Sequence, residues 1–381
     1  MSIEVPSGFR RLQRGLTGER TLIGHPYMDQ PELLEAYLGY YWPVSRAQGR
    51  HVLAHPALKE YLPAPGWTAI DAGSGPGPLA CAWVEGGCAS VCLIDRSRSA
   101  LDLAERIIPE RMESPSGTPV PEIISVPGDF SRLEPEKIPY WGAAHLVSFG
   151  HCINEVYPEI KDSGIRVKKK VELFKRWASA LVPGGFFIVI EPALLETSRE
   201  LLAVRDQLVA AGWRIIAPCP GRQSLPCPAL AAGPAQTCHE EFSWVPPVQT
   251  ERMAGELGLD KNVLKMCWFA LQPPEGTSSE SDLGENTRCR LPAGNPEGEY
   301  MRVVSEALLN KGGRLRRLVC SQRGRLPLSV SASSPLASTS GFLDLRRGEL
   351  ILLESPEQRE SGWGVDENTT IIRFASDQEQ C

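Results

Sequence analysis

The stretch Ala69-Ile70-Asp71-Ala72-Gly73-Ser74-Gly75-Pro76-Gly77 decides the fold. It continues an apolar run that begins at Trp67, and it precedes a small-residue helix candidate, Leu79 to Val84. Glycines spaced two apart let the backbone turn at positive φ and let a ligand lie against bare main chain. A helix N-terminus adds unpaired N–H donors and the positive end of a dipole. We therefore predict a strand, a tight ligand-binding turn and a helix.

The ligand class follows from the acids around this loop. Its pattern, D-x-G-x-G-x-G, differs from the dinucleotide pattern G-x-G-x-x-G, and Asp71 would repel a pyrophosphate. An acid at this position suits a ligand with a cationic amino-acid part, such as S-adenosylmethionine. Asp95 ends the next apolar run and can accept both ribose hydroxyls. Asp129 and Phe130 follow a third run and can hold an adenine ring. The alternative interpretation is three ordinary turns. The predicted cofactor-binding residues are Asp71, Gly73, Ser74, Gly75, Gly77, Asp95, Asp129 and Phe130.

Composition limits the function classes. The 381 residues are enough for two domains, and a hydrophobic content of 42% is enough for a substantial core. The net charge of −6 means that any nucleic-acid surface must be local. There is no apolar run of about eighteen residues, so we expect no membrane span. The first residues lack an apolar signal core, and we expect a cytoplasmic protein.

The chain divides into four regions by pattern. We expect a helical region at 1–62, with helices at Leu33 to Tyr41 and near His51 to Tyr61. Residues 63–272 alternate strands and helices, which indicates a parallel sheet with a cysteine-rich insertion at 217–250. Residues 273–298 resemble a linker, and 299–381 a small β-rich segment. Within the last region, residues 314–330 predict a hairpin with a basic face.

Three of the eleven cysteines lie in one irregular stretch. Cys219 and Cys227 are each framed by prolines, and Cys238 follows eleven residues later. Stiff proline-framed thiols pack poorly in a core and are good metal ligands. A fourth ligand is needed, and Cys320 is the first candidate, with His239 second. Spacing does not separate zinc from an iron–sulfur cluster, although C-x-x-C knuckles are absent. Free thiols without metal are the remaining alternative. Cys81, Cys88, Cys92 and Cys267 lie in apolar runs and are predicted core residues.

These motifs resemble those of the methyltransferase-like family of mitochondrial ribosomal small-subunit assembly factors and its bacterial relatives, over about residues 37 to 330. The resemblance is carried by Tyr37, Pro43, Arg46, the Asp71 loop, Asn154-Glu155, Glu191-Pro192, the two P-C-P triplets, Cys238-His239 and Val319-Cys320. The chain departs from the family in two ways: Gly221 follows the first P-C-P triplet where the family has histidine, and the gap between the first two cysteines is longer.

The resemblance has implications for fold, cofactors and partners. It implies a class I S-adenosylmethionine methyltransferase (Rossmann-like) sheet, with a helical lead-in, a cysteine-rich insertion and a basic β-rich C-terminal segment. It also implies S-adenosylmethionine and a four-iron–four-sulfur (4Fe-4S) cluster as cofactors. Its partners would be the small ribosomal subunit and its rRNA, with no membrane. By position the cluster ligands would be Cys219, Cys227, Cys238 and Cys320.

Catalysis stays open at this point. Asn154 and Glu155 follow the fourth strand and are the candidate catalytic residues, with Tyr157 able to help orient a substrate. The proline pair of amino-methylating enzymes is absent there. The chain is therefore either an rRNA methyltransferase or a non-catalytic assembly factor that binds rRNA through its basic hairpin. A zinc-stapled small-molecule methyltransferase is a third hypothesis.

Overall fold

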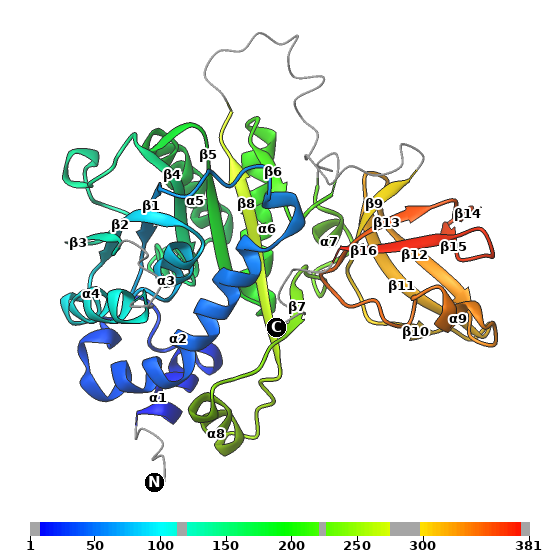
Figure 1. The fold of residues 1–381 in the computed structure, drawn as a ribbon, viewed down its shortest axis with the longest axis horizontal. Helices are drawn as coiled ribbons and strands as arrows, with labels where there is room; N and C mark the ends of the chain where they lie inside the picture. The colour runs from blue at the N-terminus through cyan, green and yellow to red at the C-terminus, as the bar shows by residue number, and fades with distance from the viewer. Residues whose placement is uncertain (1–7, 113–119, 221–225, 275–297, 375–381) are drawn as a thin grey trace. The chain divides into compact units, whose positions relative to one another are not determined.

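A computed structural model describes residues 8–112, 120–220, 226–274 and 298–374 (Figure 1). The chain forms two compact units. The first contains Met1–Leu53, Tyr61–Leu194 and Ser243–Leu264; the second contains Ala54–Glu60, Leu195–Phe242 and Lys265–Cys381. Most of the predicted linker lies outside the described residues. In the described ranges, no helix is long and apolar enough to cross a membrane.

The first unit is built on parallel strands in the order β3-β2-β1-β4-β5. The sheet order continues through β8 to β6, which is antiparallel to β8. This is the strand order of class I S-adenosylmethionine methyltransferases, so the predicted fold class is confirmed. The strands are β1 (Trp67–Ala72), β2 (Cys88–Asp95), β3 (Glu122–Pro127), β4 (Ala144–Gly150), β5 (Leu181–Pro192), β6 (Arg214–Ala217) and β8 (Val263–Gln272). The helices between the parallel strands are α3 (Pro78–Glu85), α4 (Arg98–Met112) and α5 (Ser163–Trp177).

The strand order positions a ligand site. β1 has β2 on one side and β4 on the other, so the chain reverses its direction of travel across the sheet at β1. Ligands of open α/β sheets bind at the carboxyl ends of the strands beside such a switch point. In the register, Asp71 of β1 lies opposite Ser148 of β4 and Leu93 of β2. The loop that follows Asp71 is therefore at the expected edge.

The N-terminal helices differ from expectation. After α1 (Phe9–Gln13), a single helix α2 (Pro31–Leu53) covers the first predicted helix and only the start of the second, and Pro43 lies inside it. A proline lacks an N–H and leaves the carbonyl four residues earlier without its helical donor. Here that carbonyl, Gly39 O, accepts from Thr250 Oγ1 of α8 (Val248–Glu256) at 2.9 Å. The prediction of a break was wrong because a side chain distant in sequence replaces the missing donor.

The second unit contains α6 (Leu195–Ala210) and the cysteine-rich segment. This segment forms a short helix, α7 (Pro228–Ala231), and leads into β7 (Glu240–Ser243), which pairs with β8. Cys81, Cys88, Cys92 and Cys267 are buried in helices and strands of the two units. This agrees with the predicted core role of these four thiols.

The remaining strands of the second unit form another sheet, in the order β14-β15-β12-β11-β9-β13-β16, with β10 on β11. Their bounds are β9 (Glu299–Val303), β10 (Leu308–Leu309), β11 (Arg314–Ser321), β12 (Gly324–Ser331), β13 (Leu350–Glu354), β14 (Glu357–Arg359), β15 (Gly362–Gly364) and β16 (Thr370–Phe374), with α9 (Leu336–Thr339) after β12. The predicted hairpin is β11 and β12, paired from Arg314↔Ser331 to Ser321↔Gly324. Residues after 330 complete its core, which includes Phe342, Ile351 and Trp363.

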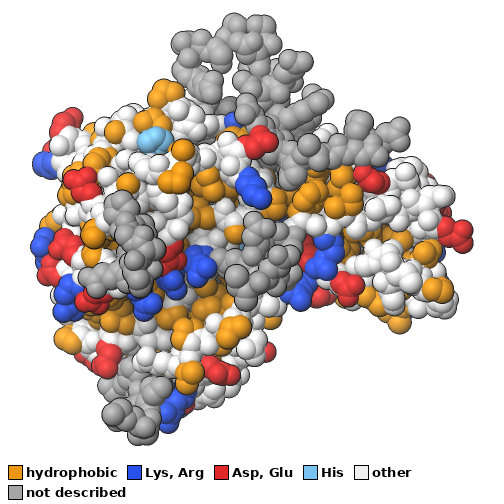
Figure 2. Space-filling model, in the orientation of Figure 1, with side chains coloured by type: hydrophobic (Ala, Val, Ile, Leu, Met, Phe, Trp, Pro, Cys, Tyr) orange, Lys and Arg blue, Asp and Glu red, His pale blue; other side chains and the backbone are white. Residues whose placement is uncertain are grey.

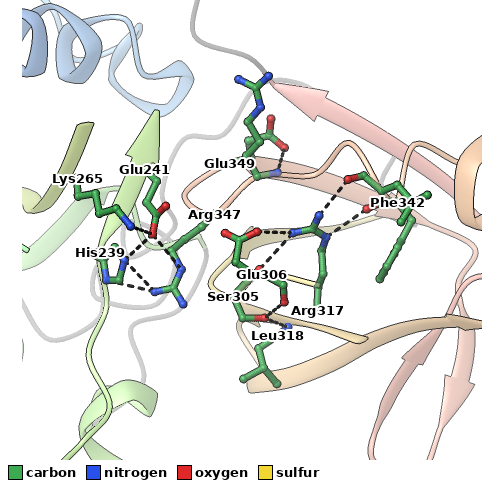
Figure 3. Close-up of polar contacts among 12 residues, drawn as sticks. His239, Glu241, Lys265, Ser305, Glu306, Arg317, Leu318, Phe342, Arg347 and Glu349 are labelled. Carbon is green, nitrogen blue, oxygen red and sulfur yellow. Dashed lines mark hydrogen bonds and ion pairs between the residues drawn. The ribbon is translucent and has the colours of Figure 1, made fainter. Parts of the chain in front are cut away.

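The hairpin's basic face is smaller than its composition suggests. Arg317 points inward and is 4% exposed. Figure 3 shows its guanidinium directed at Phe342 and Ser305, and it donates to the Phe342 and Leu343 carbonyls at 3.2 and 3.0 Å. Strand alternation places Arg316 on the opposite side, where it is exposed. Arg317 therefore stabilises the fold and does not add to the outer basic face.

Candidate functional site

The glycine loop after β1 has the geometry expected of a ligand-binding turn. Gly73, Gly75 and Gly77 have φ of 74°, 53° and 71°. A Cβ on Gly73 would lie 2.7 Å from Cys152 Cβ, and one on Gly77 would lie 2.9 Å from Ile108 Cδ1. Only glycine fits both the backbone and the space. The loop ends at the N-terminus of α3, with Gly77 as its N-cap.

Asp71 is a buried carboxylate with one oxygen that lacks a protein partner. Its side chain is 1% exposed, and Oδ1 accepts from Ser148 Oγ at 2.6 Å. Ser148 Oγ in turn accepts from Trp83 Nε1 at 2.9 Å. Asp71 Oδ2 is buried and has no hydrogen-bond donor within the described ranges. Burial raises the pKa of Asp71 to about 7, against the opposing effects of the Ser148 hydroxyl and the backbone N–H of Ala80. An oxygen in this state favours a ligand that brings a donor or a positive charge.

Asp95 supports the loop at the end of β2. Its Oδ2 accepts from Gly75 N at 2.9 Å, and its Oδ1 accepts from Ser97 N at 2.8 Å. Burial raises the pKa of Asp95, and the two backbone donors oppose that rise. Each carboxylate oxygen can accept a second hydrogen bond. Asp95 therefore fixes the loop and keeps capacity for the hydroxyls that the sequence predicts as its ligands.

Asp129 and Phe130 form the turn after β3. Asp129 Oδ1 accepts from Ser131 N and Oγ at 2.9 and 2.7 Å, which closes a local turn. Phe130 is buried, with its ring centroid 5.5 Å from that of Phe149. A Cβ on Gly73 would lie 3.2 Å from Phe130 Cε1, so this ring backs the glycine loop. Asp129 Oδ1 thus closes its own turn, and the Phe130 ring lies against the glycine loop.

The candidate catalytic residues after β4 are held by other parts of the chain. Asn154 Nδ2 donates to Glu191 Oε2 at 2.7 Å and to His151 O at 2.9 Å. Asn154 Oδ1 accepts from Arg20 Nη2 at 2.8 Å. Glu155 Oε2 accepts from Gly24 N at 3.2 Å. The Arg20 and Gly24 contacts were not foreseen, because no periodicity links a polar N-terminal turn to a strand end about 130 residues away.

The pKa values of the acids around this site are all shifted in the same direction. Burial raises the pKa of Glu155 to about 7, and burial raises the pKa of Glu191 to about 7. Lys170 and the Asn154 donors oppose the rise at Glu191. Together with buried Asp71, Glu191 and the half-buried Glu155 give three carboxylates with raised pKa values at the carboxyl ends of β1, β5 and β4. This concentration of acids is suited to a cationic ligand.

The four predicted metal ligands lie around one cavity in the second unit. Cys219, Cys227, Cys238 and Cys320 all line a space of about 40 Å³. They come from four segments: after β6, before α7, before β7 and near the end of β11. The cavity exceeds the roughly 10–15 Å³ that one water needs. His239, the alternative ligand, does not line the cavity, and its Nε2 lies 2.8 Å from Glu241 Oε1 (Figure 3).

The cavity's polar lining fits an anionic metal–thiolate group. Burial raises the pKa of Cys219, Cys227 (to about 12) and Cys320, so the thiols are protonated without a metal. Thr237 Oγ1 and Arg325 Nε, also in the lining, are buried and without a hydrogen-bond partner in the described part of the chain. Four thiols with unsatisfied donors beside them match what such a group needs. As they stand, no three His, Cys, Asp or Glu residues in the described ranges are spaced to hold a metal ion.

Comparison with known proteins gives one family match. The family model described as mitochondrial small ribosomal subunit Rsm22 matches residues 48–330. No curated protein matches the sequence significantly. Among solved structures, the chain is similar to a SAM-dependent methyltransferase from Leishmania major, with 14% identity and a TM-score of 0.36, covering 71% of this chain and 87% of that one. It is also similar to an rRNA methylase from Streptococcus thermophilus, with 11% identity and a TM-score of 0.30, covering 58% and 95%.

Proposed function

This chain belongs to the Rsm22 family, and we propose that it is a cytoplasmic factor that binds S-adenosylmethionine and the rRNA of the small ribosomal subunit. The main support for the cofactor is that Asp71 Oδ2 is a buried acceptor without a partner in the described ranges. It lies beside a loop that only glycines can form. The ammonium and sulfonium groups of S-adenosylmethionine supply positive charge to the buried acids. Asp71 would face the amino-acid part, and Asp95 the ribose.

Calorimetry with S-adenosylmethionine tests the cofactor proposal. The wild-type chain should bind it, and Asp71→Asn and Asp95→Asn should each weaken binding. Asp102→Asn serves as the control, because Asp102 is an exposed carboxylate on α4, paired with Arg98. Equal affinities in all four proteins would contradict the assignment of the site.

Contact with rRNA is proposed for exposed cations of the β11–β12 hairpin and of the turn that leads into it from β10. In the face of the molecule that Figure 2 shows, Lys and Arg are interspersed with Asp and Glu, so any RNA surface is local. Lys311, Arg316 and Arg323 are exposed, and Arg323 lies 4.8 Å above the Trp363 ring. Neutralised phosphates release counterions, so RNA affinity should fall steeply with salt. Removing these three charges should flatten that dependence, and an unchanged slope would exclude this surface.

Methyl transfer is a second candidate, which one observation favours. Glu155 has a pKa of about 7, and a general base works best when its pKa is near the working pH. The cofactor would supply an electrophilic methyl group, and Glu155 would take the proton from a base nitrogen. Radiolabel transfer to immature small subunits tests this step. A chain that binds cofactor and rRNA but labels no RNA is an assembly factor, and Asp71→Asn would then leave its association with the subunit intact.

We also propose that Cys219, Cys227, Cys238 and Cys320 hold a 4Fe-4S cluster, with zinc as the alternative metal. The shared cavity and the donor set support this. Protein purified without oxygen should be brown and carry about four irons per chain. Cys320→Ser should lose the metal, whereas Cys267→Ser, the same change at a buried thiol of β8, should keep it. One zinc per colourless chain would exclude the cluster but leave the four ligands.

A further inference from the structure

Two buried arginines line the cysteine cavity. Arg205 projects from α6 and is 2% exposed, and Arg302 projects from β9 and is 3% exposed. Arginine is almost never fully buried unless it is paired. Each of the two is paired with one carboxylate and also lies next to one of the cavity cysteines. A carboxylate partner alone would satisfy a buried arginine, so the additional position beside a cysteine indicates a role at the cavity.

Arg302 connects a thiol to an acid. Its Nη1 donates to Cys238 Sγ at 3.1 Å, and its Nη2 donates to Glu240 Oε2 at 3.0 Å. Glu240 Oε2 also accepts from Trp268 Nε1 at 2.6 Å. The acid is therefore fixed by a second donor and in turn fixes the guanidinium. One edge of the guanidinium is directed at the sulfur.

Arg205 repeats the arrangement at the other cysteines. Its Nη1 donates to Asp206 Oδ1 at 2.6 Å, and Asp206 Oδ2 accepts from Cys227 N at 2.8 Å. Arg205 lines the cavity together with Cys219 and Cys227. The acid that orients Arg205 thus also fixes the backbone of a second cysteine. The two arginine–carboxylate pairs thus bind the Cys238 thiol and the Cys227 backbone.

A metal held by four thiolates makes an anionic group in a buried place. Four thiolates carry four negative charges, and a dipositive zinc or 4Fe-4S core leaves a net charge of −2. Burial of that charge is unfavourable unless cations and donors face it. Hydrogen bonds to cluster sulfurs and nearby charge also set the reduction potential. Arg205 and Arg302 supply both where the cysteines converge.

We propose that Arg205 and Arg302 are positioning residues of the metal centre: each holds a cavity cysteine in place and neutralises part of the charge of the metal–thiolate group. The inference rests on the proposed cysteine centre. The arginines bind no metal themselves, so their role is additional to that of the four cysteines. Each acts through its cysteine and through the field in the cavity.

The test separates charge from packing. Arg302→Gln alone would remove the positive charge that balances buried Glu240, so the variant to use is Arg302→Gln with Glu240→Gln, which replaces the ion pair by two neutral amides. Arg302→Lys keeps the positive charge and is the conservative variant. Arg317→Gln is the matched control, because Arg317 is a buried arginine of the same unit that does not line the cavity.

Each full-length variant is reconstituted with iron and sulfide without oxygen. Metal per chain, the rate of iron loss to a ferrous chelator and the midpoint potential are then measured. We expect the double variant to fold and to hold metal about 10- to 100-fold more weakly, as second-sphere changes do, with a more negative potential. Arg302→Lys should recover part of both. Arg317→Gln should lower stability but leave the loss rate and the potential unchanged.

Two results would overturn the inference, and the first of them would overturn the proposed cysteine centre as well. If wild-type protein takes up neither iron nor zinc, the cysteine centre and the role of the arginines fail together. If wild type binds metal and the double variant matches it in loss rate and potential, the centre stands and only the arginine inference fails. With zinc as the metal, the loss rate alone decides in the same way.

Discussion

Replacing Asp71 by asparagine should change how the stability of the first unit depends on pH. Burial raises the pKa of Asp71 from its ordinary value of 3.8 to about 7, and the side chain is 1% exposed. Below pH 4 the carboxyl is neutral in both folded and unfolded chains. Between about pH 4 and pH 7 the unfolded chain loses its proton first, so the free energy of unfolding falls as pH rises. Above pH 7 the loss is complete and stays constant.

The size of the effect follows from the two pKa values. A rise from 3.8 to about 7 corresponds to about 4 kcal/mol, or about 1.4 kcal/mol for each pH unit between them. Asparagine keeps the shape and cannot ionise, so this slope should disappear. Its amide adds a buried donor, which lowers stability by about 1–3 kcal/mol at every pH. The change in slope, and not the offset, is therefore the quantity to compare.

Urea unfolding at pH 5, 6, 7 and 8 measures that slope. Hydrogen exchange of the β1 amides identifies the transition that belongs to the first unit. Wild type minus Asp71→Asn should change by about 3 kcal/mol between pH 5 and 7. Asp102→Asn, an exposed carboxylate, should show no such change. Parallel pH profiles for wild type and Asp71→Asn would refute the assignment of a raised pKa and remove the main argument for a cationic ligand.

Two further predictions concern the loop and the hairpin. Gly73→Ala should abolish cofactor binding in calorimetry and lower the urea midpoint, because its Cβ would meet Cys152 at 2.7 Å. Gly66→Ala shares a positive φ but has nothing within 4 Å, so it isolates backbone strain of about 1–3 kcal/mol. Arg316→Ala should lower the salt dependence of RNA binding by about one unit without altering stability. Arg317→Ala should do the reverse and destabilise the fold by a few kcal/mol, since it leaves buried carbonyls without donors; equal effects of the two changes would contradict the burial difference.

The sheet could be predicted from sequence because its determinants are local. Apolar runs ending in acids and glycines mark β1, β2 and β3, and the observed strands end at or just before Asp95 and the glycines Gly73 and Gly128. Helix α2 could not be predicted, since the donor that compensates for Pro43 is Thr250, about 200 residues away. Local patterns report local hydrogen bonds, and a helix that passes through a proline depends on a tertiary one.

The cysteine cavity shows the same division. The proline-framed thiols can be found from the sequence, and together with Cys320 they line one cavity, which supports the proposed ligand set. Arg205 and Arg302 were not visible, because each lies in an ordinary helix or strand pattern. Their proposed role follows from the direction in which their guanidinium groups point. Whether a charged residue belongs to a site depends on its partners, and only the fold brings a partner such as Glu240 next to Arg302.

The hydrogen bonds of Asn154 constrain catalysis more than they constrain cofactor binding. Both amide hydrogens are donated within the chain, and its oxygen accepts from Arg20. A substrate base that needed this amide would have to displace Glu191, His151 or Arg20 first. Asp71 Oδ2, by contrast, has no protein donor in the described ranges to displace. In the proposed function, the cofactor side therefore has an acceptor open to a ligand, whereas Asn154 and Glu155 on the proposed substrate side are held by the N-terminal turn. A methyltransferase must release that turn in each cycle, and an assembly factor that only binds cofactor need not.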